Sequence, residues 1–286
     1  DALPIYRLER CRPHGWYFTA YSSADLKDWT YEGVVLDLRS PQVPWANGNA
    51  WAPAVEERLM NGKYKYFFYY SGNPESGGGK QIGVAVGDSP VGPFKDMGKP
   101  IITESPTGHG QQIDVDVFTD LMTGTPYIYW GNGYMAGAEL NSDMVSLKQE
   151  TVTVMTPKGG TLKDYQYREA PYVFYRHGLY YFLWSVDDTG SANYHVAYGT
   201  SDTPLGKIKV AKDPIVTIQD PAKEIYGPAH CSVIRKPGTD DWYIVYHRIN
   251  KHYIGKDKQP GIHREVCIDR LEFNPDGTIR RVALTD

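Results

Sequence analysis

Four short runs of the chain decide its fold: Trp51-Ala-Pro-Ala-Val55, Ile113-Asp-Val-Asp-Val-Phe118, Glu169-Ala-Pro-Tyr-Val-Phe174 and Ala229-His-Cys-Ser-Val-Ile234. Their first residues are separated by 62, 56 and 60 residues. After each run comes a turn and then a second run that is rich in aromatic residues. These second runs read NGKYKYFFYYSG (61–72), TGTPYIYWGNG (123–133), HGLYYFLWSV (177–186) and GTDDWYIVYHR (238–248). Self-similarity at a fixed long period is typical of repeat architectures.

A third kind of run occurs five times. The copies read TAYSSADLKDWT (19–30), GVAVGDSPVGPF (83–94), GAELNSDMVSLK (137–148), HVAYGTSDTPLG (195–206) and EVCIDRLEFNPDG (265–277). The first four copies end in a turn that contains an aspartate: Asp25, Asp88, Asp143 and Asp202. Such a turn favours a connection into a fourth strand.

These patterns predict an all-β protein. The runs are rich in Val, Tyr, Phe, Trp and Thr, and no long stretch has the 3.6-residue periodicity of a helix. A unit of about 60 residues with three or four short strands is typical of a β-propeller blade, and five third runs predict five blades. A sandwich or an open meander also uses many short strands, but would not repeat its turn chemistry at this period. No linker or shift in composition divides the chain, so residues 1–286 are predicted to form one domain.

Composition excludes several classes of protein. The chain has 286 residues, of which 41% are hydrophobic and 22% charged, unlike a disordered chain or a coiled coil. No apolar run approaches the roughly 20 residues of a membrane-spanning helix. The net charge of −4 gives no general reason to bind nucleic acid. Three cysteines are too few for a disulfide framework, and Cys231 and Cys267 are predicted to be buried free thiols. The segment DALPIYRLERCRPHG has no apolar region of a signal peptide, and localisation and oligomeric state stay open.

Polar side chains at the starts of the first runs are expected to converge, because the innermost strands of a propeller line one central channel. These starts carry Trp51, Asp114, Glu169 and His230. Burying a carboxylate is costly unless it is paired, hydrated or functional. Two carboxyl groups, a histidine and an aromatic ring at one opening indicate a hydrolase-like site. The alternative is that Asp114 and Glu169 cap strand ends and accept hydrogen bonds from loop amides.

At these residues the chain resembles glycoside hydrolase family 43, whose five-bladed propellers remove arabinose or xylose units from plant polysaccharides with inversion. The resemblance covers most of residues 15–281, in the order of the family's motifs. The matching segments are NAWAPAVEERLMNGKYKYFFYYSG, QQIDVDVFTDLMTGTPYIYWGNG, REAPYVFYRHGLYYFLWS, GPAHCSVI with WYIVYHR, and HREVCIDRLEFNPDGTI. Any one of these segments is a weak signal, whereas five in order are a specific one.

The resemblance implies roles for two carboxyl groups. Glu169, in Arg-Glu-Ala-Pro, matches the general acid, and Asp114 matches the aspartate that orients this acid and tunes its pKa. A general acid must stay protonated near neutral pH, and a neighbouring carboxylate and a partly dry pocket would both raise its pKa. Asp116 follows Asp114 on the opposite face of the same strand by alternation, and is expected to be structural.

The family's general base, an aspartate, does not have a match. It begins the innermost strand of the first blade, and the repeat period places that position about ten residues before Asp1. Asp1 and Asp37 do not fit it, and residues 1–15 do not read as a second, aromatic strand. The first blade is therefore predicted to be incomplete at the N-terminus. Either an amino-terminal segment that carries the base precedes the chain, or the propeller is catalytically impaired.

Three further residues are predicted to bind substrate or a metal. His230 matches a family histidine at the channel centre that in many members coordinates a hydrated Ca²⁺ ion, so the resemblance implies a structural Ca²⁺ held mainly by water. Arg264 matches an arginine that points at the sugar. Trp51 is expected to line the sugar pocket. The alternatives are a hydrogen-bonded structural histidine, an ion-paired surface arginine and a tryptophan that packs in the core.

The predicted function is an inverting glycoside hydrolase that acts on arabinofuranosyl or xylosyl linkages of an oligo- or polysaccharide. One alternative is a non-catalytic sugar-binding propeller that has lost its base. Another is a retaining, invertase-like five-bladed enzyme, which needs Asn-Asp-Pro and Arg-Asp-Pro motifs, and neither occurs in the sequence.

Overall fold

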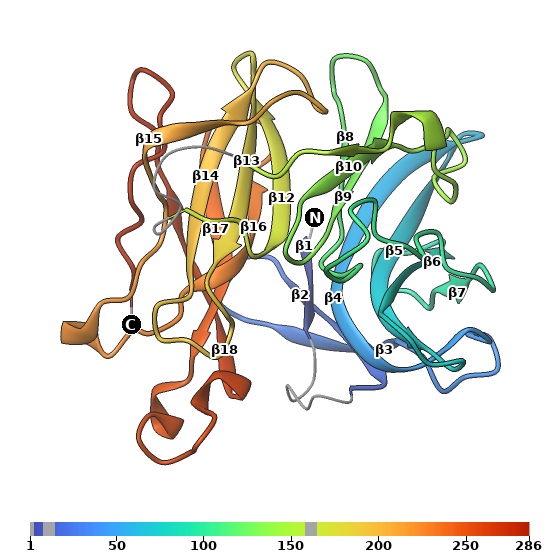
Figure 1. Ribbon diagram of the computed structural model, residues 1–286, viewed down its shortest axis with the longest axis horizontal. Helices are drawn as coiled ribbons and strands as arrows, with labels where there is room; N and C mark the ends of the chain where they lie inside the picture. Colours follow the sequence, from blue (N-terminus) through green and yellow to red (C-terminus); the bar gives the residue numbers. More distant parts are fainter. Residues whose placement is uncertain (1–2, 8–14, 158–164, 286) are drawn as a thin grey trace. The chain divides into compact units, whose positions relative to one another are not determined.

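The computed structural model describes residues 3–7, 15–157 and 165–285, and its regular structure is almost entirely short β-strands (Figure 1). Within these ranges the helical elements are short 3₁₀ turns, at Gln149–Thr151, Pro221–Lys223, Lys251–Tyr253 and Pro260–Ile262. None of the helices in the described part of the chain is long and apolar enough to cross a membrane.

The strands of the described residues form five sheets, and within each sheet the strands are neighbours in chain order. The first two sheets are β1 (Leu3–Arg7), β2 (Tyr17–Ser23) and β3 (Thr30–Asp37), then β4 (Ala46–Met60), β5 (Lys63–Pro74), β6 (Gln81–Gly87) and β7 (Lys95–Asp96). The next two are β8 (Asp116–Thr119), β9 (Pro126–Trp130), β10 (Ala136–Glu139) and β11 (Thr153–Val154), then β12 (Glu169–Arg176), β13 (Leu179–Val186), β14 (His195–Ser201) and β15 (Lys209–Ile215). The last is β16 (Ala229–Arg235), β17 (Trp242–Ile249) and β18 (Arg264–Leu271).

The repeated runs of the sequence correspond to equivalent strands of successive sheets. The aromatic second runs form β5, β9, β13 and β17, and the third runs form β2, β6, β10, β14 and β18. The turns that carry an aspartate lead into β3, β7, β11 and β15, as predicted. The strand character and the order of the repeats are thereby confirmed.

Two hairpins show how local sequence sets the strand pairing. Asn61 and Gly62 join β4 to β5 with φ values of 52° and 76°, and His177 and Gly178 join β12 to β13 with φ values of 48° and 91°. A two-residue hairpin with positive φ at both positions matches the twist of the flanking strands, and Asn-Gly is the favoured sequence for it. Glycine at the second position is what makes each turn sterically accessible.

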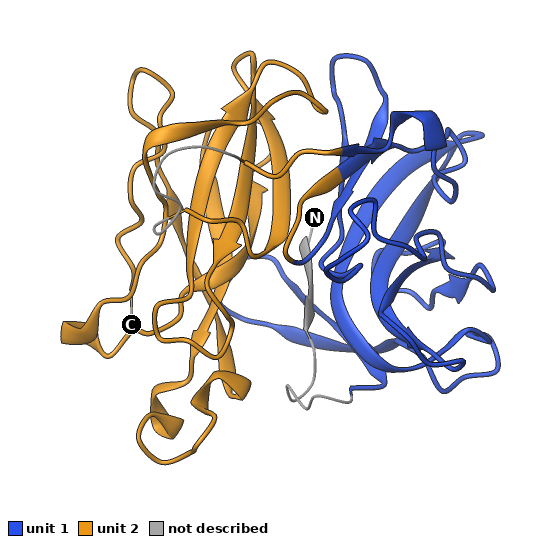
Figure 2. Ribbon diagram, viewed as in Figure 1, with its two compact units in different colours: residues 1–132, 137–153 blue, residues 133–136, 154–286 orange. Residues whose placement is uncertain are grey.

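The chain divides into two compact units, each with its own aromatic core (Figure 2). The first consists of residues 1–132 and 137–153, and the second of residues 133–136 and 154–286. In the first unit the ring of Phe68 lies 5.0 Å from Phe18 and 4.9 Å from Phe94. In the second unit the ring of Phe174 lies 4.9 Å from Tyr181 and 5.0 Å from Trp242. Aromatic residues therefore pack both within a sheet and between neighbouring sheets.

Three details of the sequence-based prediction need correction. Residues Leu3–Arg7 form a strand that pairs with β2, so the prediction that residues 1–15 contribute no second strand is wrong. Here pairing with a neighbouring strand outweighs a weak local signal. In the second sheet β4 begins at Ala46, before Trp51, and in the third sheet β8 begins at Asp116, after Asp114. Asp1, Ala2 and residues 8–14 lie outside the described residues.

The cysteines differ in environment. Cys231 is a buried free thiol, as predicted, and Cys267 is a free thiol that is only half-buried. Burial raises the pKa of Cys267 to about 11, which makes its reactive thiolate scarce at neutral pH. Cys11 lies outside the described residues.

Candidate active site

A left-handed residue recurs near the start of the first strand in each of the second to fifth sheets. The φ values are 39° at Ala52, 58° at Asp114, 57° at Ala170 and 53° at His230. The strand pairing shifts register beside three of these residues, between Trp51 and Ala54, between Glu169 and Tyr172, and between Ala229 and Ser232. Such bulges re-aim side chains and concentrate next to active sites. Backbone strain of this kind in non-glycine residues points to function.

A buried serine holds the backbone at two of these left-handed residues. The N–H of Asp114 donates to Ser71 Oγ over 3.2 Å, and the N–H of His230 donates to Ser185 Oγ over 3.0 Å. Ser71 belongs to β5 and Ser185 to β13, so each bond joins one sheet to the next sheet along the chain. In each case the serine hydroxyl satisfies a backbone N–H of a left-handed residue.

In the first unit, Lys80 links the predicted residues Trp51 and Asp114. Its ammonium nitrogen lies 3.9 Å from the centroid of the Trp51 ring and donates to Gln111 Oε1 over 3.1 Å. Burial lowers the pKa of Lys80, and the charge of Asp114, which is 5% exposed, opposes this effect. One face of Trp51 is therefore covered by a cation, so a sugar can stack only on the other face unless Lys80 moves. Asp116 is buried at the start of β8 and pairs with Tyr129.

In the second unit, Glu169 begins β12 and is 8% exposed. Its Oε1 accepts a hydrogen bond of 2.7 Å from the hydroxyl of Tyr194. A ring nitrogen of His230 lies within 4.8 Å of a carboxylate oxygen of Glu169. The structure thus brings the predicted general acid and the predicted channel histidine together.

Arg264 and His247 complete this cluster. Arg264, the first residue of β18, donates to His247 Nε2 over 3.1 Å and to Thr189 Oγ1 over 3.2 Å. The His247 ring centroid lies 5.7 Å from that of Tyr194 and 5.8 Å from that of His230. Three residues of the predicted site, Glu169, His230 and Arg264, therefore occur in one cluster of the second unit.

Both histidines of the cluster are held neutral. Burial lowers the pKa of His230 to about 4, with Arg264 acting in the same direction and Glu169 against it. Burial also lowers the pKa of His247 well below its usual value, and Arg264 and His230 add to the effect. Near neutral pH, the imidazole of His230 that lies beside Glu169 is therefore uncharged.

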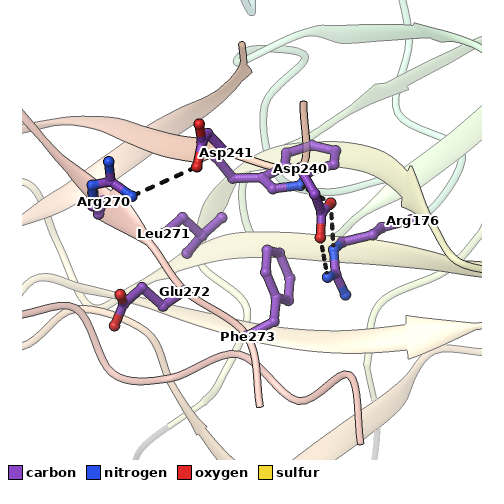
Figure 3. Close-up of a pocket in the computed structure, with 8 residues that line it drawn as sticks. Arg176, Asp240, Asp241, Arg270, Leu271, Glu272 and Phe273 are labelled. Carbon is purple, nitrogen blue, oxygen red and sulfur yellow. Dashed lines mark hydrogen bonds and ion pairs between the residues drawn. The ribbon is translucent and has the colours of Figure 1, made fainter. Parts of the chain in front are cut away.

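Glu169 begins β12, and a cavity of about 200 Å³ lies at the other end of this strand, at Arg176 (Figure 3). Arg176, the last residue of β12, forms an ion pair of 2.5 Å with Asp240 there, and its guanidinium lies 4.1 Å from the centroid of the Phe273 ring. Asp241 pairs with Arg270 over 3.7 Å. Because these charges are paired within the protein, we assign this cavity a structural role.

Sequence reasoning missed Tyr194, His247 and Lys80. Lys80 follows a glycine-rich loop, and Tyr194 precedes the third run that begins at His195. Neither position has a local signal of its own, since each residue acquires its role from a contact distant in the chain. His247 lies in the quoted run WYIVYHR, as an imidazole between the buried residues Tyr246 and Arg248.

Comparisons with known proteins show what the chain is similar to. The model of "Glycosyl hydrolases family 43" matches residues 13–279. A β-D-galactofuranosidase, xynD, of Aspergillus niger is 35% identical over 94% of this chain and 75% of its own length. An arabinoxylan arabinofuranohydrolase of Bacillus subtilis is 29% identical over 92% of this chain, which spans 54% of that protein. The crystal structure of a GH43_1 enzyme from Xanthomonas citri complexed with xylose has a TM-score of 0.78 and 25% identity, covering 98% of this chain and 87% of that one. Together with the five sheets, this likeness shows an all-β propeller fold.

Proposed function

The chain belongs to the glycosyl hydrolases of family 43, and we propose that this glycoside hydrolase releases arabinofuranosyl or xylosyl units from plant cell-wall polysaccharide with inversion. The relative from Bacillus subtilis is named for arabinofuranosyl release from arabinoxylan, and the structure from Xanthomonas citri holds xylose. The observation that carries the proposal is the environment of Glu169, a buried carboxyl group at a bulged strand start with a tyrosine hydroxyl on one oxygen.

Glu169 is proposed as the general acid and Asp114 as the residue that tunes it. Glu169 would transfer its proton to the glycosidic oxygen as the bond from that oxygen to the anomeric carbon breaks. A water molecule would attack the anomeric carbon from the opposite face and give its proton to a carboxylate base. The residue that supplies this base stays a prediction.

The proposal also includes one catalytic domain, a five-bladed propeller in which each sheet is a blade. The support is the recurrence of equivalent strands in five sheets and of the left-handed residue in four of them. In such a propeller the starts of the innermost strands carry the candidate site residues Trp51, Asp114 and Glu169.

Trp51, Arg264 and His230 are proposed to bind the sugar. An aromatic ring such as Trp51 offers an apolar face to the sugar, and the planar fork of Arg264 can bind two hydroxyl oxygens. The hydrogen bonds of Arg264 to His247 and Thr189 fix the direction of its guanidinium before substrate arrives.

His230 is also proposed as a ligand of a structural Ca²⁺ ion. The low pKa of His230 keeps its imidazole neutral, which suits coordination. A single nitrogen is a poor partner for this oxygen-seeking cation, so His230 would hold the ion as one ligand among waters. The ion would supply positive charge beside the sugar. Metal analysis of the purified protein before and after chelation tests its presence.

A galactofuranosidase is the second candidate, because the relative from Aspergillus niger carries that name at 35% identity. Hydrolysis of the para-nitrophenyl glycosides of α-L-arabinofuranose, β-D-xylose and β-D-galactofuranose separates these candidates. We expect turnover of the arabinofuranoside or the xyloside, with the inverted anomer formed first in proton NMR. Turnover of the galactofuranoside alone would favour the second candidate. Sugar binding without turnover of any of the three would contradict both and support a binding propeller.

A further inference from the structure

Tyr194 approaches the general acid from a part of the sheet that is not adjacent to it. It lies in a turn, closed by a 3.2 Å hydrogen bond from its N–H to Ser191 O, directly before β14. In the sheet order β13 lies between β12 and β14, so the side chain reaches past the end of β13 to the start of β12. Tyr194 is 0% exposed, and a buried tyrosine hydroxyl requires a hydrogen-bond partner. Glu169 supplies it.

The ring of Tyr194 is held on one side by His247. The two rings stack with an interplanar angle of 23°, and His247 in turn accepts a hydrogen bond from Arg264. Arg264 is fixed by a second bond, to Thr189. The orientation of the Tyr194 hydroxyl therefore depends on β17, β18 and the segment that follows β13, so the rest of the second unit determines the direction of this donor before substrate binds.

A neutral donor is suited to an acid that must keep its proton. A cation in the place of the Tyr194 hydroxyl would strongly favour the ionised form of Glu169, whereas a hydroxyl fixes the position of the carboxyl group with a smaller preference for that form. The Tyr194 hydroxyl donates to Oε1 of Glu169. The proton that Glu169 transfers to the leaving group is therefore assigned to Oε2. A general acid has to present its proton within hydrogen-bond reach of the leaving oxygen, so the choice of oxygen matters.

We infer that Tyr194 is a positioning residue for Glu169: by donating to Oε1 it fixes the carboxyl plane and directs Oε2 toward the leaving group. This inference rests on the proposed role of Glu169 as general acid. It predicts that the Tyr194 hydroxyl contributes most to kcat on substrates whose leaving group most needs a proton.

The first test compares Tyr194→Phe with wild type on the methyl and para-nitrophenyl glycosides of the sugar that the enzyme releases. Both substrates have the same sugar, but the methyl glycoside depends far more on the acid. We expect kcat on the methyl glycoside to fall about tenfold with KM unchanged, and kcat on the nitrophenyl glycoside to fall about twofold. Equal losses on both substrates, or no loss on either, would overturn the inference.

Tyr181→Phe is the matched control. Tyr181 is also buried and its hydroxyl donates over 2.7 Å, but to the backbone oxygen of Gly277. The control variant therefore loses a similar hydrogen bond with no contact to Glu169, and we expect both kcat values within about twofold of wild type. A leaving-group effect in Tyr181→Phe equal to that in Tyr194→Phe would show a general structural effect and overturn the inference.

A second readout does not require turnover. Carbon-13 NMR of protein labelled at the glutamate carboxyl carbons, with Glu169→Gln to assign the resonance, reports the environment of Glu169 at one fixed pH. We expect Tyr194→Phe to shift this resonance and Tyr181→Phe to leave it in place. If Tyr194→Phe does not fold, fluorotyrosine at position 194 keeps the packing and strengthens the donor, and is expected to shift the resonance in the opposite direction. An unmoved resonance would overturn the inference, whereas an inactive wild type with a resonance that moves would contradict only the proposed function.

Discussion

The backbone N–H of His230, a left-handed residue at the second position of β16, donates a hydrogen bond to the hydroxyl of Ser185 over 3.0 Å. The same relationship occurs two sheets earlier, between Asp114 and Ser71. In both places a fully buried serine of the preceding sheet stabilises a backbone conformation that costs about 1 kcal/mol or more for a residue with a β-carbon. The same hydrogen bond to a buried serine therefore orients the backbone of two candidate site residues, Asp114 and His230.

Ser185→Ala should destabilise the protein by about 1–3 kcal/mol, because the buried N–H of His230 is left without its acceptor. Ser71→Ala should have an effect of similar size. Urea unfolding followed by tryptophan fluorescence measures both. Ser201→Ala is the control, since that buried hydroxyl accepts only a long turn bond of 3.3 Å, from Thr203, and the expected loss is smaller. Equal losses of stability in all three variants would show that the hydrogen bonds from Asp114 and His230 contribute no more than the turn bond at Ser201.

Much of the fold was predictable because the repeat is local and periodic. The starts of β12 at Glu169 and of β16 at Ala229 agree with the predicted runs, where an apolar strand follows a proline or a polar turn. The start of β8 was not predictable, because the unusual φ of Asp114 depends on Ser71, a residue more than forty positions earlier. The strand at Leu3–Arg7 was not predictable because its local signal is weak and it forms by pairing with β2.

The candidate site was predictable only in part for the same reason. Trp51 and Glu169 occupy the first position of their runs, whereas Asp114 and His230 occupy the second, so simple alternation would place the two pairs on opposite faces. The left-handed residues at Ala52, Asp114, Ala170 and His230 break this alternation, and no sequence pattern predicts them. Tyr194 and Lys80 were missed because each reaches its partner through tertiary contacts.

Glu56→Gln should make the protein less sensitive to pH. Burial raises the pKa of Glu56 to about 7, although the Thr119 N–H, which donates to Glu56 Oε1 over 3.1 Å, opposes this effect. Since the folded-state pKa lies above the unfolded value, the wild type loses stability as pH rises from about 4.5 through 7. Glutamine can keep the bond to Thr119 without a charge, so the variant should be more stable than wild type by about 1–3 kcal/mol at pH 8 and similar to it at pH 5.

Urea midpoints at the two pH values measure this difference, and Glu57→Gln, at an exposed neighbour on the same strand, is the control. A gain at pH 8 in the control, or a gain at pH 5 in Glu56→Gln that equals its gain at pH 8, would contradict the assignment.

Lys80→Met should be more stable than wild type at pH 7. The environment lowers the pKa of Lys80 mainly by burial, so the charged form is disfavoured in the folded protein despite the Trp51 ring. Because the folded-state pKa lies below the unfolded value, this cost is present at neutral pH and disappears as pH rises toward the unfolded value. Denaturation at pH 7 and pH 10 should show the advantage of the variant shrinking, and exposed Lys63→Met should show no such trend. An advantage that grows with pH would be the opposite of the expected sign.

Arg176→Met should lower stability by about 1 kcal/mol and leave catalysis unchanged. The ion pair with Asp240 is partly exposed and contributes little, while the guanidinium also packs on Phe273 (Figure 3). Thermal unfolding and steady-state kinetics of the same preparation check both parts. A rise in KM above about threefold, with the fold intact, would mean that this cavity takes part in substrate binding.

The central claim, that Glu169 is the general acid, is tested most directly by kcat of Glu169→Gln on the methyl and nitrophenyl glycosides of one sugar. Glutamine keeps the shape of the side chain and can accept the Tyr194 hydrogen bond, but it has no proton to give. General acid catalysis contributes about 10²–10⁴-fold, so kcat on the methyl glycoside should fall by that factor and kcat on the nitrophenyl glycoside by far less. Equal losses on the two substrates, or an active variant on the methyl glycoside, would contradict the assignment.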